Sequence, residues 1–174
     1  MHDLDLAILD LVQSVHAGWL DVASSVVGLF GQTEVTLGIA LGLAVARWRR
    51  DRRDAVVPLF IVVTILVEAA LKIVFPQAPP PHERSRAVEL IPFVHAPFAY
   101  SFPSGHVARA SFLLAIGRGI PVVVVAIGIV LMALTRIYLG EHWFSDTVGG
   151  AVLGLAVAAL ARRVTRGPSG RLRA

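Results

Sequence analysis

Apolar runs separated by short polar segments dominate the sequence. Residues 55–75, 120–139 and 145–161 are nearly continuous in apolar side chains. Each run is close to the ~20 residues that a helix needs to cross the hydrocarbon core of a bilayer. A shorter apolar helix is predicted at 105–117, after a polar, proline-rich stretch at 76–103. The pattern predicts an all-α, polytopic membrane helical bundle of five or six transmembrane helices.

The first fifty residues leave the number of spans open. Residues 4–16 repeat apolar side chains near the helical period. This indicates either an interfacial helix within residues 1–18 or the start of a first span. Apolar residues then run from 19 to 30 and again from 33 to 48, with Gly31 between the two runs. Two short spans and one long helix across Gly31 both fit this pattern.

The composition excludes a water-soluble globule. Of the 174 residues, 56% are hydrophobic and 16% are charged, whereas soluble domains have about 45–50% and roughly 25%. We expect a single membrane-embedded domain over 1–174, with a motif-bearing core at about 55–164 and a cytoplasmic tail at 165–174. The absence of cysteine excludes disulfides, iron–sulfur clusters and thiolate zinc sites.

Basic residues are concentrated where apolar runs end, which predicts an orientation. The formal net charge is +4, but no basic stripe lies on a soluble element, so we expect no nucleic-acid partner. Basic residues beside spans mark cytoplasmic loops. Alternation of the spans then places 76–103 and the turn at 140–145 on the outer face. This predicts a multi-pass protein of the plasma or inner membrane. A functional site formed by these two segments would face outside or the periplasm. The basic groups are the hinge Arg47, Arg49, Arg50, Arg52 and Arg53, the single Arg118, and the tail Arg162, Arg163, Arg166, Arg171 and Arg173.

Polar and ionisable side chains gather at the predicted outer ends of the helices. Such groups are costly in a membrane, so a cluster of them is a functional hypothesis by default. The cluster contains Lys72 with Glu68 one turn before it, the block Pro103–Ser104–Gly105–His106, Arg136, and His142 with Asp146.

The spacing of His142 and Asp146 predicts an activated histidine. Residues four apart share one face of a helix, so the carboxylate can bind one ring nitrogen and leave the other as a nucleophile or base. Residues 104–106, at a helix start, offer N–H groups to an anion. The two cations of the cluster suit the negative charge of a phosphoryl transition state. With His106 to protonate a leaving oxygen, the set suits metal-free phosphoryl transfer.

At these residues the chain resembles the type-2 phosphatidic-acid phosphatase superfamily, which also includes bacterial acid phosphatases and vanadium haloperoxidases. The family signature has three blocks: a lysine, six residues, then Arg-Pro; Pro-Ser-Gly-His; and Ser-Arg, five residues, His, three residues, Asp. The second block is intact at 103–106. The third has Arg136, His142 and Asp146 at the family spacing, with Thr135 in place of serine. The resemblance covers about 55 to 160.

The first block of the signature departs from the family. Lys72 and Pro80 fit, but Pro79 stands where the family has an arginine that holds phosphate oxygens. A weakened, an altered and an inactive site are therefore all open. The candidates to replace the missing arginine are Arg84, Arg86 and Arg109.

The resemblance also implies a role for each residue. His142 attacks phosphorus and forms a phosphohistidine, Asp146 orients His142, and His106 is the general acid for the leaving group. Water then hydrolyses the intermediate, with no metal and no other cofactor. The implied phosphate-binding residues are Lys72, Ser104, Gly105 and Arg136.

The resemblance, together with the small size of the chain, implies a lipid-phosphate phosphatase acting at the outer leaflet. The first expected substrate is a polyprenyl diphosphate, namely undecaprenyl diphosphate, the carrier lipid of cell-wall synthesis. Phosphatidic acid and phosphatidylglycerol phosphate follow. Membrane lipids are the expected partners, and the oligomeric state stays open. The alternatives are a phosphotransferase that uses a lipid or sugar acceptor, and a non-catalytic binder of lipid phosphates, which Pro79 motivates.

Overall fold

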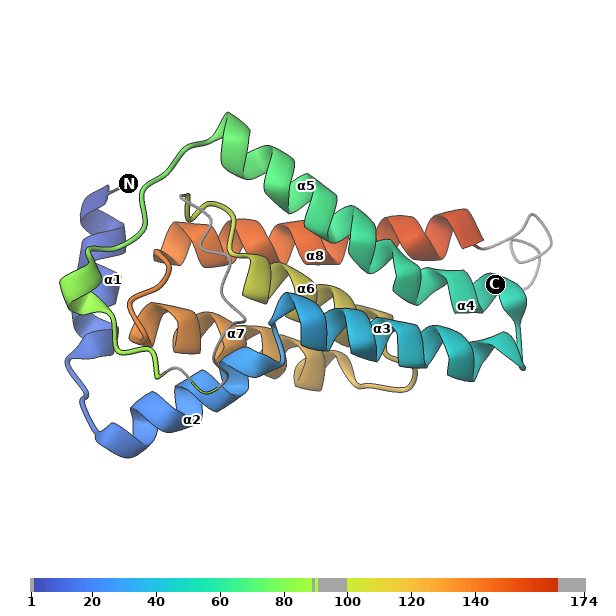
Figure 1. Ribbon diagram of the computed structural model, residues 1–174, viewed down its shortest axis with the longest axis horizontal. Helices are drawn as coiled ribbons and strands as arrows, with labels where there is room; N and C mark the ends of the chain where they lie inside the picture. Colours follow the sequence, from blue (N-terminus) through green and yellow to red (C-terminus); the bar gives the residue numbers. More distant parts are fainter. Residues whose placement is uncertain (1, 89, 91–99, 166–174) are drawn as a thin grey trace.

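Every regular element in the described chain is a helix. The computed structural model describes residues 2–88, 90 and 100–165. Figure 1 shows a bundle of roughly aligned helices with one helix lying across its end. The α-helices are α1 (His2–Gln13), α2 (Gly18–Leu29), α3 (Thr33–Trp48), α4 (Arg52–Val56), α5 (Ile61–Val74), α6 (Gly105–Ile116), α7 (Val122–Tyr138) and α8 (Phe144–Thr165). Two 3₁₀ helices complete the order, η1 (Val57–Phe60) between α4 and α5, and η2 (His82–Arg84).

The lengths and composition of the helices are those of a membrane protein. Two helical stretches of the described chain are long and apolar enough to cross a bilayer. The first, Arg52–Val74, consists of α4, η1 and α5 in direct succession, and the second, Phe144–Thr165, is α8. The pair α2 and α3 adds a third span if it is counted as one broken helix, because the two helices meet at a 45° bend. The helices α6 and α7 are shorter but apolar. The predicted all-α membrane bundle is confirmed.

The outer surface of the bundle is apolar. Val122 is 84% exposed and Ile73 is 77% exposed, and large aliphatic side chains are exposed along α3, α5, α7 and α8. Contiguous apolar surface on this scale is unfavourable in water and marks contact with a partner or a membrane. It suits the hydrocarbon of a bilayer.

The bend between α2 and α3 excludes an unbroken helix over the N-terminal run. The chain forms two helices joined at residues 30–32, and not one continuous helix across Gly31. At 12 residues, α2 is too short to cross a bilayer alone, since about 20 residues are needed. Gly31 lies at the bend, and a Cβ there would come within 2.8 Å of the Cβ of His106. Only glycine leaves room for this close approach.

The first helix does not run along the axis of the bundle. In Figure 1 α1 lies across the end of the bundle where α7 ends and α8 begins. Its Leu9 is buried with Ile137 and Trp143, and the Gln13 side-chain amide donates to the carbonyl of Tyr138 (3.0 Å). Of the two sequence interpretations, α1 is a helix of its own and not the start of a span.

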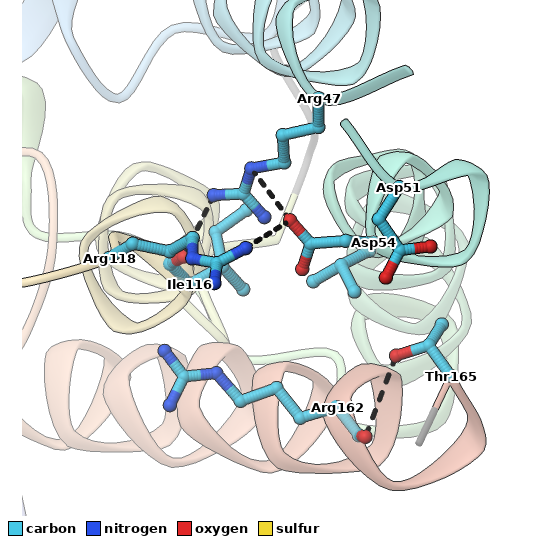
Figure 2. A pocket seen from close by; sticks show the side chains of 8 residues that line it. Arg47, Asp51, Asp54, Ile116, Arg118, Arg162 and Thr165 are labelled. Carbon is cyan, nitrogen blue, oxygen red and sulfur yellow. Dashed lines mark hydrogen bonds and ion pairs between the residues drawn. The ribbon is translucent and has the colours of Figure 1, made fainter. Parts of the chain in front are cut away.

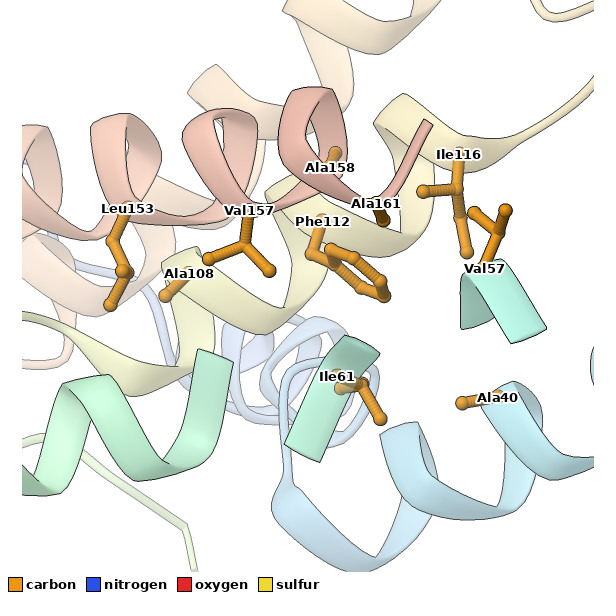
Figure 3. Close-up of a cluster of buried hydrophobic side chains, with 10 residues drawn as sticks. All are labelled: Ala40, Val57, Ile61, Ala108, Phe112, Ile116, Leu153, Val157, Ala158 and Ala161. Atoms are coloured by element: carbon orange, nitrogen blue, oxygen red, sulfur yellow. The ribbon is translucent and has the colours of Figure 1, made fainter. Parts of the chain in front are cut away.

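The core lies where α6 is enclosed by α3, α5 and α8 (Figure 3). Small residues let α6 and α8 approach closely, as in other membrane helix pairs. A Cβ on Gly154 would lie 2.9 Å from the backbone nitrogen of Phe112. The cluster consists of Ala40, Val57, Ile61, Ala108, Phe112, Ile116, Leu153, Val157, Ala158 and Ala161.

We predict that Gly154→Ala destabilises the bundle, by about 1–3 kcal/mol, because an added methyl group overpacks the contact between α6 and α8. The matched control is Gly42→Ala on α3, where a Cβ would meet no atom within 4 Å. There alanine keeps its better helix propensity and should leave stability unchanged or raise it. Thermal unfolding midpoints in one detergent compare the two variants. Equal midpoints would contradict the packing argument.

Candidate active site

The turn between α7 and α8 carries a histidine–aspartate pair. His142 Nδ1 lies 3.4 Å from Asp146 Oδ2, slightly longer than an ideal hydrogen bond. The His142 side chain is 11% exposed, and Asp146 is fully buried. The same Asp146 oxygen accepts the backbone N–H of Trp143 (2.8 Å). This second bond fixes the carboxylate at the start of α8, so it can orient the imidazole.

The surroundings of His142 favour its neutral form. Burial lowers the pKa of His142 below its ordinary value of 6.5. The contact with Asp146 opposes this shift and raises the pKa, while the positive charges of Arg136 and Lys72 lower it. The net direction is downward, so the ring is uncharged at neutral pH. An uncharged imidazole has a nitrogen lone pair with which to attack an electrophile.

The block 103–106 begins α6 beside this pair. Ser104 is the N-cap of α6, and its backbone N–H donates to the carbonyl of Asp146 (2.9 Å). This bond joins two sequence blocks that are more than 35 residues apart. Gly105 and His106 form the first turn of α6, whose N–H groups and dipole favour an anion. On its other side, His106 packs against the bend at Gly31.

Two buried cations share one carboxylate next to the start of α6. Lys72 Nζ lies 3.9 Å from Glu68 Oε1 and donates to the carbonyls of Tyr100 (2.8 Å) and Ser101 (3.3 Å). Arg109 forms an ion pair with the other oxygen of Glu68. The Glu68 carboxylate occupies the place that a Cβ on Gly105 would need. The group is therefore built against the backbone of α6.

Arg109 is also anchored to the bend between α2 and α3. Its Nε donates to the carbonyl of Gly31 (2.9 Å). The guanidinium thus links α5, through Glu68, to the N-terminal part of the chain. Of the three arginines named as replacements for the missing family arginine, Arg109 is placed with Lys72.

The side chains of Arg84 and Arg86 contact the N-terminal part of the chain instead. Arg84 Nη1 lies 2.8 Å from Asp10 Oδ1. Arg86 donates to the carbonyls of Gln13 (3.0 Å) and Val15 (3.1 Å), and its guanidinium carbon lies 5.2 Å from the centre of the Tyr138 ring. These contacts fasten the segment around η2 to the N-terminal helix.

Arg136 is buried at the end of α7 and has a carboxylate partner that the sequence analysis missed. It forms an ion pair with Glu141, five residues later. Gly28 on α2 leaves space for the guanidinium, since a Cβ there would lie 2.6 Å from Arg136 Nη1. Residues five apart do not share one helix face. The two side chains meet because α7 ends at Tyr138, between Arg136 and Glu141. No sequence signal could have identified the pair.

Trp143 is a second residue that the sequence did not single out for the site. It is buried, and its indole N–H donates to the carbonyl of Ala78 (2.8 Å). The bond brings the residue before Pro79 to the turn that carries His142. Pro79, which stands where the family has an arginine, therefore directly follows a residue that contacts this turn. A pattern of residue types carries no signal for such a backbone contact.

Several polar atoms of the cluster are buried without a partner in the described chain. Ser104 Oγ, Arg136 Nε and Asp146 Oδ1 have no hydrogen bond. Buried polar groups are nearly always satisfied, so such atoms call for an explanation. In Figure 1 the ends of α5 and α7 and the starts of α6 and α8 lie at the same end of the bundle. Among the described residues, no three His, Asp or Glu side chains are grouped as metal ligands.

Comparison with solved structures identifies the fold. The chain superposes on the crystal structure of a transmembrane PAP2-type phosphatidylglycerolphosphate phosphatase from Bacillus subtilis with a TM-score of 0.76 and 22% identity, covering 94% of this chain and 85% of that one. It superposes on the crystal structure of Aquifex aeolicus LpxE with a TM-score of 0.70 and 23% identity, covering 92% and 95%. A search of curated proteins finds no match.

Comparison with protein families identifies the lineage. The family model of the PAP2 superfamily matches residues 55–168, which is more than half of the chain and contains all three signature blocks. The resemblance stated from the motifs is confirmed, and the chain belongs to the PAP2 superfamily, the type-2 phosphatidic-acid phosphatases.

Proposed function

We propose that this protein is a membrane lipid-phosphate phosphatase that works through a phosphohistidine intermediate. The observation that carries the proposal is the hydrogen bond from Ser104 N–H to the Asp146 carbonyl (2.9 Å). It holds the start of α6, to which we assign phosphate binding, beside the His142–Asp146 pair. The membrane family to which the chain belongs supports the same activity.

In the proposed reaction, His142 is the nucleophile. Its Nε2 lone pair attacks phosphorus while the bond from phosphorus to the leaving oxygen breaks, and His106 gives that oxygen a proton. Asp146 balances the positive charge of the phosphorylated imidazole. Water then attacks the same phosphorus, the P–N bond breaks, and His106 takes a proton from the water. The products are inorganic phosphate and the dephosphorylated lipid.

The phosphate oxygens need donors and positive charge in the transition state. We assign these to Lys72, Arg136, the Ser104 hydroxyl and the backbone N–H groups at Gly105. The unpartnered Ser104 Oγ and Arg136 Nε support this assignment. We assign Arg109 the place of the missing family arginine, since it shares Glu68 with Lys72.

The substrate we propose first is undecaprenyl diphosphate, with phosphatidic acid and phosphatidylglycerol phosphate next. The first choice is the one that the motif resemblance to bacterial enzymes of this family implies. The similar Bacillus subtilis structure, described as a phosphatidylglycerolphosphate phosphatase, supports a phospholipid phosphate. We place the site at the outer leaflet of the plasma or inner membrane, because the arginine-rich turns lie at the other end of the bundle.

A non-catalytic binder of lipid phosphates is the second candidate, and Pro79 is the observation that favours it. Such a protein would bind the phosphate through its cations but would not hydrolyse the lipid. Removing a nucleophile would then change little, whereas removing a cation would weaken binding. The two candidates thus predict different effects for a histidine variant and for a cation variant.

We predict that purified protein in detergent releases inorganic phosphate from undecaprenyl diphosphate, and that His142→Ala lowers kcat at least about a thousandfold, as expected for loss of a nucleophile. EDTA should leave the wild-type rate unchanged, because no proposed step uses a metal. The matched control is His16→Ala, at an exposed histidine. Wild-type binding without release from any of the three lipids would favour the binder.

The pH dependence follows from the direction of the His142 shift. Only the neutral ring attacks, and the pKa of His142 lies below 6.5. The acid limb of kcat/KM should therefore fall below pH 6.5, with the rate still high at that pH. Asp146→Asn removes the contact that raises the pKa, so the residual activity of this variant should have its acid limb at lower pH. A limb above 6.5 in the wild type would contradict the assignment.

Three arginine variants test the replacement for Pro79. Arg109→Gln should lower kcat/KM by roughly a hundredfold or more, the usual effect of losing one transition-state donor. Arg84→Gln and Arg86→Gln carry the same change of charge but bind α1, so their rates should stay within a few-fold of wild type. Helix content by circular dichroism checks that each variant folds. A large loss of rate with Arg84→Gln or Arg86→Gln, and none with Arg109→Gln, would reverse the assignment.

A further inference from the structure

The end of the bundle opposite the candidate active site holds a basic cavity of about 300 Å³ (Figure 2). Three arginines from separate elements line it. Arg47 comes from the last turn of α3, Arg118 from the turn between α6 and α7, and Arg162 from the last turn of α8. The remaining lining residues are Asp51, Asp54, Val57, Ile116 and Thr165.

The arginines are held in place by contacts that leave the cavity positive. Asp54 Oδ2 lies 3.0 Å from Arg118 Nη1 and 3.6 Å from Arg47 Nε, and Figure 2 shows both guanidinium groups turned toward this carboxylate. Arg47 also donates to the carbonyl of Ile116 (2.9 Å), and Arg162 donates to that of Ala115. The lining has three arginines and two aspartates, so it carries an excess positive charge. A guanidinium has five N–H donors, more than these contacts use.

An apolar cavity of about 520 Å³ adjoins the basic one and shares Arg118 and Arg162 with it. Its large apolar side chains are Ile120 in the turn before α7, Val122 and Val125 at the start of α7, and Leu155 on α8. Ile120, Val122 and Leu155 belong to the exposed apolar surface of the bundle. The rest of its lining consists of Ala115, Gly117 and Gly119. Two arginines therefore stand at the boundary between a charged and an apolar space.

We propose that the two cavities together bind one anionic phospholipid of the surrounding bilayer. Its headgroup phosphate would lie at Arg118 and Arg162, and an acyl chain would lie in the apolar cavity between α7 and α8. Basic pockets between transmembrane helices bind anionic headgroups on the positively flanked side of a membrane. A free phosphate ion would use the basic cavity alone. This lipid is distinct from the substrate, since it binds at the other end of the helices.

The test compares lipids on the full-length protein, purified in a neutral detergent. Retention in native mass spectrometry is titrated with dioleoyl phosphatidylglycerol, dioleoyl phosphatidylcholine, glycerophosphoglycerol and inorganic phosphate. Retention of phosphatidylglycerol should exceed that of phosphatidylcholine, because only the first has a net negative headgroup. Glycerophosphoglycerol and inorganic phosphate, which have no acyl chain, should bind far more weakly.

Variants separate this site from general surface charge. Arg118→Gln and Arg162→Gln should each weaken phosphatidylglycerol binding about fivefold, as expected for one basic residue at a membrane surface. The matched control is Arg163→Gln, an exposed neighbour that lines neither cavity, and it should bind like wild type. Val125→Phe fills the apolar cavity without changing charge and should also weaken binding.

Several outcomes would overturn the proposal. Equal loss with Arg163→Gln would indicate surface charge alone, and equal retention of phosphatidylcholine would show that the headgroup is not recognised. Binding of inorganic phosphate as tight as that of phosphatidylglycerol would make the ligand a free anion. If the two arginine variants fail to fold, unchanged retention in Val125→Phe would by itself contradict a lipid in the apolar cavity.

Discussion

The close packing of α6 against α8 is the constraint on which the rest of the structure depends. Gly150 and Gly154 let the two backbones approach, since a Cβ on Gly150 would lie 3.2 Å from the nitrogen of Ala108. At the end of this contact, the N–H of Ser104 reaches the carbonyl of Asp146. A change in the distance between the two helices would therefore move the start of α6 relative to His142. The apolar core and the polar candidate site therefore lie along the same pair of helices.

The N-terminal third of the chain also contacts residues of the candidate site, although the family match begins only at residue 55. The carbonyl of Gly31 accepts from Arg109, and Gly28 leaves space for Arg136. Charged groups in a membrane interior need partners, and the bend between α2 and α3 supplies one of them from its backbone. The break in the helix therefore frees the Gly31 carbonyl for Arg109, because a straight helix would bond this carbonyl internally.

The apolar pattern predicted the later helices closely, since each run must be about as long as the bilayer is thick. The run 120–139 became Val122–Tyr138, and the helix expected at 105–117 became Gly105–Ile116. The sequence left open whether the helix breaks at Gly31, because the break depends on contact with His106, far away in sequence. The motif blocks identified the residues that the structure gathers at one end. Sequence left open which arginine joins Lys72, since that depends on how the chain returns after Pro79.

The burial of Trp143 has a consequence for spectroscopy. Trp143 is 4% exposed and its indole is hydrogen-bonded to Ala78, whereas Trp19 and Trp48 are 70% and 55% exposed. The chain has no other tryptophan. Quenchers dissolved in the lipid or in water would reach the two exposed indoles and leave the emission of Trp143, which lies directly beside His142. The protein thus carries an intrinsic fluorophore next to His142 in the chain, and its buried emission can be distinguished from that of the two exposed indoles without a label.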